Sequence, residues 1–350
     1  MAARTRGKPR PAVPGLVVLV LVAVSGFLTL ELRGREVTGV TEVRSAGVLD
    51  GTHALGGAPE NGGGQRWSRL ENPARSVLRD ADGRVRAVLT DGTRTAVLTG
   101  PVRTFAEPAT TSSRVSTTDW VRLLPRPWRK GAEKERWFTR WYARYGDSTE
   151  DDLFAFAFQY VTGAPRKKDG RGAVPAGAED GGPRPERSGF YDCLGVPYRF
   201  RDGSAGRPKT PRARSLDHAG FIRTVFGHRA RYPLLPTDTG TGGLPCTADA
   251  MARSGEGVDV LPPTGAGPDH RPLAIDRLQP GDLVFFARDP RTGERLDHVG
   301  MVLGHDTEGH LVFVSSRQEA DGPTIGDVGG ASRLDGNGSY ARALRSAKRL

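Results

Sequence analysis

The pattern of apolar and polar positions predicts short strands in the first half of the chain. From Ser76 to Phe105, short β-rich runs are separated by Asp80-Ala81-Asp82-Gly83 and by Asp91-Gly92. Asp-Gly pairs of this kind are typical of hairpin turns. The Asp80 and Asp82 pair also resembles part of a calcium loop, but the other ligands at loop spacing are missing. The segment therefore predicts a small β-meander.

Between residues 120 and 161 the apolar positions change to a helical period. Three aromatic residues recur at every fourth position: Trp137, Trp141 and Tyr145. They fall on one face of a helix, and we expect this face to pack against the rest of the protein, because an amphipathic face is usually buried. Ser148 and Asp151 resemble a capping box that opens a second helix. A helical pair is therefore expected after the meander.

The second half predicts one short helix followed by strands. Asp217 is a good N-cap, residues 221–226 supply an apolar face, and Gly227 suits the left-handed position at a helix C-terminus. Residue 218 then lies in the first turn. The backbone N–H groups there, and the positive end of the helix dipole, would lower the pKa of a thiol and stabilise an oxyanion.

Strands follow this helix at residues 283–286, 298–304 and 311–316. The first is entered through the turn Gln279-Pro280-Gly281-Asp282, and the second begins at His298. The third follows a turn that contains Gly309. A helix followed by an antiparallel meander is typical of an α+β fold.

Two segments lack the large apolar residues that a core needs. Residues 32–75 are read as a flexible stalk, and residues 166–188, rich in Pro, Gly and charge, as a linker. These boundaries give a domain of β-meander plus helices at residues 76–165 and a second domain at residues 189–350. Two modest domains fit a chain of 350 residues.

The N-terminus has the pattern of an export segment. Four cations lie in the first ten residues: Arg4, Arg6, Lys8 and Arg10. The run from Gly15 to Leu30 is apolar except for Ser25 and Thr29. Residues 1–31 therefore predict a signal peptide or a membrane anchor. We expect the remainder to lie outside the cytoplasm, in the cell envelope or secreted, with the membrane as a partner if the segment is not cleaved.

Charge and cysteine content narrow the possible partners. The net charge of +11 favours anionic surroundings such as acidic wall polymers or lipid headgroups. The excess is scattered Arg without a basic helix or interleaved aromatic residues, so no nucleic-acid partner is expected. Two cysteines, Cys193 and Cys246, are too few for a disulfide scaffold, and they either form one bridge or stay free.

Four motifs in order carry a resemblance to a known family. They are Gly195-Val196-Pro197-Tyr198, Asp217-His218-Ala219-Gly220-Phe221, Pro280-Gly281-Asp282-Leu283-Val284-Phe285-Phe286 and Asp297-His298-Val299-Gly300. From about Asp192 onward the chain resembles the NlpC-type cell-wall cysteine peptidases. The resemblance implies a compact papain-like α+β fold. It also implies peptidoglycan stem peptides as partners, cleaved in active members next to D-glutamate or diaminopimelate.

The resemblance also assigns roles to residues. It implies a nucleophile at position 218, a base at His298, an oxyanion site near the Ala219 N–H, and a positioning role for Tyr198. The third polar residue is expected on the following strand, where Ser315 is the candidate. His218 offers neither a thiol nor a hydroxyl for attack. We therefore expect lost or altered catalysis on a hydrolase fold, or a non-catalytic peptidoglycan-binding or regulatory module.

Two alternatives would supply the catalytic group that position 218 lacks. Cys193 or Cys246 could replace the missing thiol, although neither begins a predicted helix aimed at His298. His218 and His298 could instead form the core of a metal-dependent hydrolase, but two histidines are too few ligands and no paired-ligand spacing accompanies them. We expect no cofactor and no resident metal. The other histidines of this half (His228, His270, His305 and His310) fall in predicted loops or turns and are expected to be solvated.

Overall fold

The computed structural model describes residues 64–161, 190–208, 216–263, 270–320 and 322–350. Within these residues the fold is α+β, with short helices and antiparallel sheets, as the order of predicted elements indicates. The expected export segment (1–31) and the expected linker (166–188) lie outside the described residues. In the described ranges, no helix is both long enough and apolar enough to span a membrane.

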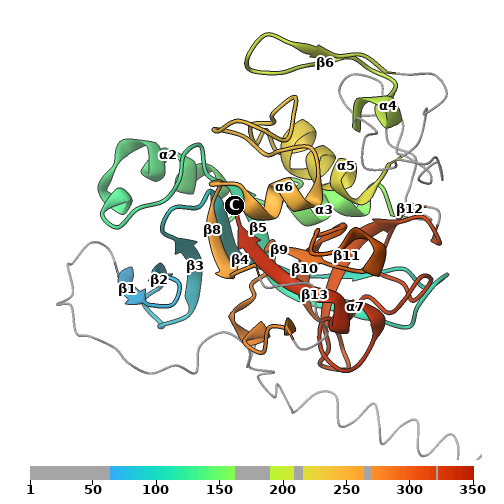
Figure 1. The fold of residues 1–350 in the computed structure, drawn as a ribbon. Coiled ribbons are helices and arrows are strands. Elements are labelled where there is room, and N and C mark those ends of the chain that lie inside the picture. Colours follow the sequence, from blue (N-terminus) through green and yellow to red (C-terminus); the bar gives the residue numbers. More distant parts are fainter. Residues whose placement is uncertain (1–63, 162–189, 209–215, 264–269, 321) are drawn as a thin grey trace, which may run out of the picture. The chain divides into compact units, whose positions relative to one another are not determined.

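The first sheet is an antiparallel meander whose five strands follow the order of the chain. These strands are β1 (Arg66–Leu70), β2 (Arg75–Arg79), β3 (Val85–Thr90), β4 (Thr95–Ala106) and β5 (Arg114–Leu123) (Figure 1). The Asp80 carboxylate accepts hydrogen bonds from the N–H groups of Asp82 and Arg84, at 3.1 and 2.9 Å. Asp80 therefore closes a hairpin turn, as its sequence context indicates.

The sheet begins earlier than the sequence pattern indicates. β1 lies inside the segment 32–75 that was expected to be a stalk. Its Trp67 ring stacks on Trp128 with centroids 5.7 Å apart, and Arg69 donates two hydrogen bonds to Asp91, at 2.9 and 2.7 Å. These long-range contacts stabilise β1, although its mainly polar sequence does not predict a strand. The prediction was wrong for this part of the stalk.

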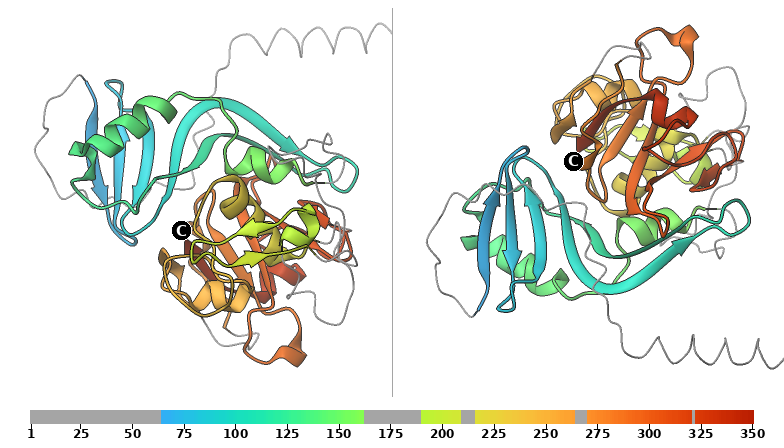
Figure 2. Two further views of the ribbon diagram at one scale, coloured as in Figure 1. Left: turned by 90° about the horizontal axis from the view of Figure 1, so that it is seen from above. Right: turned by 90° about the horizontal axis from the view of Figure 1, so that it is seen from below.

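The helical pair begins later than residue 120, because Trp120 belongs to β5. The turn η1 (Ala132–Lys134) precedes α2 (Arg136–Tyr145), and α3 (Leu153–Phe158) follows. The buried Phe138 and Trp141 of α2 join a hydrophobic cluster with the meander, so the aromatic stripe packs as expected. Figure 2 shows α2 lying across one face of the meander.

The cap of α3 is Asp152, and the expected capping box of Ser148 and Asp151 is wrong. The Asp152 carboxylate accepts from the N–H groups of Ala155 (3.0 Å) and Val121 (2.7 Å) and pairs with Arg103 (2.5 Å). One side chain thus satisfies the helix start and also links it to the meander. This second contact is tertiary, so the local sequence does not predict it.

The second sheet has six strands, three of which were expected. Its order is β12 (Gly322–Thr324), β11 (Leu311–Arg317), β10 (His298–His305), β9 (Leu283–Phe286), β13 (Leu344–Arg349) and β8 (Val258–Leu261). The smaller elements of this half are α4 (Phe190–Leu194), β6 (Tyr198–Arg199), β7 (Ala205–Gly206), α5 (His218–Ile222), η4 (Arg223–Arg229), α6 (Ala248–Arg253), η6 (Ile275–Arg277), η7 (Pro290–Thr292) and α7 (Ser339–Ala343). β9, β10 and β11 match the predicted meander.

The strand β13 was not predicted, because its sequence is rich in charged residues. Arg345, Lys348 and Arg349 are all buried. Arg349 makes a bidentate ion pair with the fully buried Asp282, with both N···O distances at 2.7 Å, and Lys348 pairs with Asp259 at 2.7 Å. These partners compensate the loss of hydration, which lets a polar sequence occupy the interior of a sheet.

Alternating residues of the second sheet contribute to two hydrophobic clusters. Leu283 and Phe285 of β9 join a cluster with α5, whereas Val284 and Phe286 join a cluster with Tyr340 of α7. This alternation is the two-residue period of a strand buried on both faces. The first cluster also contains Phe105 and Phe154 from the region of residues 76–165, so the two expected domains share a core.

The helix expected at residues 217–227 continues beyond Gly227. α5 is followed directly by the π-helical segment η4, and Arg231 adopts the left-handed conformation with φ 67°. Gly227 instead allows close packing, because a Cβ there would collide with the Leu234 side chain. The expected left-handed C-terminal role of Gly227 is therefore wrong.

Candidate functional site

His218 and His298 lie together where α5 and β10 begin. Asp217 caps α5 by accepting a hydrogen bond from the Gly220 N–H, which places His218 as the first helical residue. His298 is the first residue of β10 and pairs with Phe286 of β9. α5 packs on β10 and β11, and the two imidazole centroids are 4.6 Å apart with their planes inclined by 46°.

Both imidazoles are buried and have unsatisfied nitrogens. Each residue is 5% exposed, and neither His218 Nδ1 nor His298 Nε2 has a hydrogen-bond partner among the described residues. Burial lowers the pKa of His218 to about 4, with a further contribution from Arg288. Burial, His218, Arg288 and Arg317 hold the pKa of His298 well below its ordinary value. The pair is therefore neutral at neutral pH, and each ring retains donor and acceptor capacity.

Two guanidinium groups and a phenol flank this pair. Arg288 donates to Tyr340 Oη at 2.6 Å and lies over the same ring, 4.2 Å from its centroid. Arg317 lies 4.3 Å from the Tyr340 centroid, and the Tyr340 ring is 5.3 Å from that of His298. Arg317 is buried, whereas the Arg288 side chain is 26% exposed. Arg288 also donates to the Gly329 carbonyl oxygen at 3.0 Å and lies 3.9 Å from Glu319, so its positive charge beside the imidazoles is partly compensated at a position that solvent reaches.

Ser315, the candidate third residue, contacts Arg317. Its hydroxyl accepts a hydrogen bond from Arg317 Nε at 3.2 Å. In the described part of the chain, no hydrogen bond joins Ser315 to His298. Ser315 lies fully buried on β11. It can hold Arg317 in place, but it does not orient the His298 ring in this structure.

The remaining predicted site residues fall in two places. Ala219 is fully buried in the first turn of α5, next to His218. Tyr198 lies on β6, and its ring contacts reach Phe190 (4.8 Å), Phe200 (5.0 Å) and His228 (6.4 Å). Among the residues that the structure describes, no ring contact links Tyr198 to the histidine pair.

His228 differs from the expectation that the other histidines are solvated. It lies in η4 and is buried. The short helix was expected to end at Gly227, so a continued helical segment explains the error. By contrast, His305 and His270 are exposed, and His310 Nδ1 lies 2.8 Å from Asp335 Oδ2.

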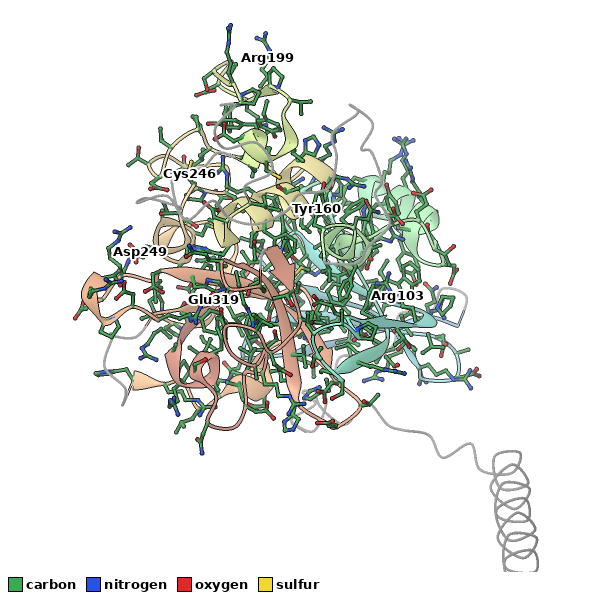
Figure 3. The ribbon with its side chains drawn as sticks, turned by 90° about the vertical axis from the view of Figure 1, so that its right-hand side faces the viewer. Arg103, Tyr160, Arg199, Cys246, Asp249 and Glu319 are labelled. Carbon is green, nitrogen blue, oxygen red and sulfur yellow. The ribbon has the colours of Figure 1, made fainter. Side chains whose placement is uncertain are left out.

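Both cysteines are free thiols, and neither joins the histidine pair. Cys193 is buried in α4, and burial raises its pKa, with further contributions from Asp217 and Asp192. Cys246, labelled in Figure 3, comes two residues before α6. Its thiol lies 3.7 Å from the Leu235 carbonyl oxygen, and burial again raises its pKa. Raised pKa values disfavour the reactive thiolate, which argues against either cysteine as a replacement nucleophile.

The charges around the pair disfavour a divalent cation. The described residues contain no group of three or more His, Cys, Asp or Glu side chains placed to hold a metal ion. Arg288 and Arg317 lower the pKa of His298, which shows that positive charge already acts at this ring. A zinc ion needs further anionic or neutral ligands in place of such cations.

Arg288, Arg317 and Tyr340 were not identified from the sequence. Strand alternation offered one signal, because Arg317 lies two residues after Ser315 and so falls on the same sheet face. Arg288 similarly follows Phe286 by two residues. Tyr340 belongs to α7, which is distant in sequence and was not predicted. Its approach to His298 depends on the tertiary fold.

Comparisons with known proteins name no relative for this chain. No family model matches it, and neither a curated protein nor a solved structure matches it. The site therefore has to be interpreted from its own residues.

Proposed function

We propose that this chain is an extracytoplasmic protein that binds peptidoglycan stem peptides on an NlpC-type, papain-like fold without cleaving them. The observation that carries the proposal is the His218–His298 pair, whose ring centroids are 4.6 Å apart. In the resembled family, a nucleophile at a helix start acts beside an imidazole at a strand start. Here the capped helix and the imidazole are both present, and position 218 supplies no attacking thiol.

The protonation state of the pair supports binding rather than acyl transfer. A neutral imidazole is a poor nucleophile towards an amide and forms only a short-lived acyl product. It is nevertheless a good hydrogen-bond donor and acceptor. The unpartnered His218 Nδ1 and His298 Nε2 are buried, so a peptide N–H or carbonyl group would bond to them only after the side chains that cover the pair move aside.

The charge beside the pair suits an acidic peptide. Stem peptides that contain D-glutamate or diaminopimelate carry carboxylates, and the guanidinium of Arg288 is a preferred partner for such groups. Arg288 already acts on both imidazoles, since it lowers the pKa of each. A bound carboxylate would offset this positive field.

Calorimetric titration of the full chain with a soluble stem peptide containing D-glutamate and diaminopimelate tests the proposal. We expect saturable binding that Arg288→Gln weakens about tenfold, the scale of one charge-assisted hydrogen bond. Arg291→Gln is the matched control, since this side chain is 90% exposed and pairs with Asp289. Equal binding by the two variants, or no binding at millimolar peptide, would contradict the proposal.

A further inference from the structure

A row of arginines occupies the outward face of α2. The helix buries Phe138 and Trp141 against the meander, and Trp137 and Tyr145 are half-buried. The exposed positions are Arg136, Thr139, Arg140, Ala143 and Arg144. This outward face has no carboxylate and no large apolar side chain. Contrary to the expectation of scattered Arg, α2 is a basic helix.

The three arginines are evenly spaced along the helix. Arg136, Arg140 and Arg144 recur at every fourth position, so each step advances about 6 Å along the axis at a rise of about 1.5 Å per residue. Side chains four residues apart lie above one another on a helix surface. The three guanidinium groups therefore form a single row.

Helix stability does not explain this row. Arg136 is the first residue of α2, and the first turn contains no acidic residue. A cation at the positive end of the helix dipole is unfavourable, whereas an acidic residue there would be favourable. The repulsion within the row adds to this effect. Arg144 lies in the last turn, where a cation is favourable, so the dipole explains this residue but not Arg136 or Arg140, which are better explained by a partner.

The preceding loop extends the positive surface. Residues 126–145 contain seven Lys or Arg residues and two Glu residues. Arg126, Arg129 and Lys130 are exposed, although Arg129 pairs with Glu135 at 2.7 Å and Arg126 lies over the Trp137 ring. At the other end, Arg144 is 3.6 Å from Glu150, with both side chains largely exposed. Such surface pairs are weak enough to exchange partners.

We propose that the outward face of α2, with the exposed cations of the loop at residues 126–130, binds a linear chain of poly(glycerol phosphate). An evenly spaced row of guanidinium groups suits a chain that carries one negative charge per repeat, and arginine is a preferred partner of phosphate. A membrane surface fits less well, because none of the exposed large hydrophobic residues in the described ranges lies on this face. The site is separate from the histidine pair and does not depend on its function.

Binding of poly(glycerol phosphate) to the full chain, measured by fluorescence anisotropy across a salt series, tests this proposal. The test variant changes Arg136, Arg140 and Arg144 to Gln. We expect its affinity at about 50 mM salt to fall about tenfold to 100-fold, and the salt slope to decrease by about one for each lost contact. The control variant changes three exposed arginines elsewhere, Arg66, Arg114 and Arg291, and should bind like the wild type.

Three outcomes would overturn the proposal. The first is an equal loss of affinity in both triple variants, which would indicate general electrostatic attraction. The second is wild-type affinity in a test variant whose thermal unfolding is unchanged. The third is binding to vesicles containing phosphatidylglycerol with no binding to the polymer, which would assign the face to a lipid surface. Thermal unfolding of both variants identifies any loss caused by misfolding.

Discussion

The imidazoles of His218 and His298, with ring centroids 4.6 Å apart, come from a helix start and a strand start separated by 80 positions in the sequence. Their neutral, buried state follows from the loss of hydration and from the nearby guanidinium groups. The reactivity of a thiol at position 218 and the stability of the fold in acid should both depend on this relationship.

Replacing His218 by Cys should create a reactive thiol. The first turn of α5 and the nearby Arg288 favour a thiolate, and we expect them to outweigh the burial of position 218, which opposes it, so the thiol pKa should fall below the ordinary value of about 8.5. The pH dependence of iodoacetamide labelling, followed by mass spectrometry at residue 218, measures this pKa. Cys193 and Cys246 serve as internal controls, since burial raises the pKa of each. A labelling midpoint at or above about 8.5 would show that the helix start does not activate a thiol.

The buried histidines should make the fold less stable in mild acid. Because their pKa values are lower in the folded state, the unfolded chain binds more protons below about pH 6.5. The two neutral histidines contribute fully to the free energy of unfolding above that pH. This contribution is lost as the pH falls towards about 4, the pKa of His218. For His218 alone the loss is about 3 kcal/mol.

Urea unfolding between about pH 4 and 8 measures this effect. His218→Gln should flatten the pH dependence, whereas the change of the exposed His305 to Gln should leave it as in the wild type. The interpretation fails if both variants retain the same slope as the wild type.

The sequence predicts β9, β10 and β11 well because their apolar runs are local signals between clear turns. It does not predict β13, in which the ion pair of Arg349 with Asp282 allows a charged strand to be buried. The sequence likewise predicts only those parts of the site that depend on local patterns. The position of His298 follows from its local strand pattern, whereas Arg288 and Tyr340 meet it only through pairings distant in sequence.

Removing the Asp282 carboxylate should strongly destabilise the protein. Asp282→Ala leaves the buried guanidinium of Arg349 without its ion pair and removes the acceptor of the Gln279 N–H. We expect a loss of about 3–5 kcal/mol in the free energy of unfolding. Asp82→Ala is the control, because its ion pair with Arg84 is exposed and should contribute less than about 1 kcal/mol. Similar losses in both variants would contradict a structural role for the buried pair.

Gly227→Ala should destabilise the fold through overpacking. The added methyl group would collide with the Leu234 side chain, and we expect a cost of about 1–3 kcal/mol. Gly255→Ala is the matched control, since its Cβ would meet no atom within 4 Å. Thermal unfolding compares the two variants. Combining Gly227→Ala with Leu234→Ala should cost less than the sum of the single changes, and strict additivity would argue against the collision.

We propose that the chain keeps a peptidase-like site without the attacking atom. Mass spectrometry of peptides released from purified peptidoglycan tests it most directly, with the wild type, His298→Gln, His218→Cys and the double variant His218→Cys/His298→Gln compared at equal concentration. We expect release by His218→Cys alone. Release by the wild type that is lost on His298→Gln would contradict it.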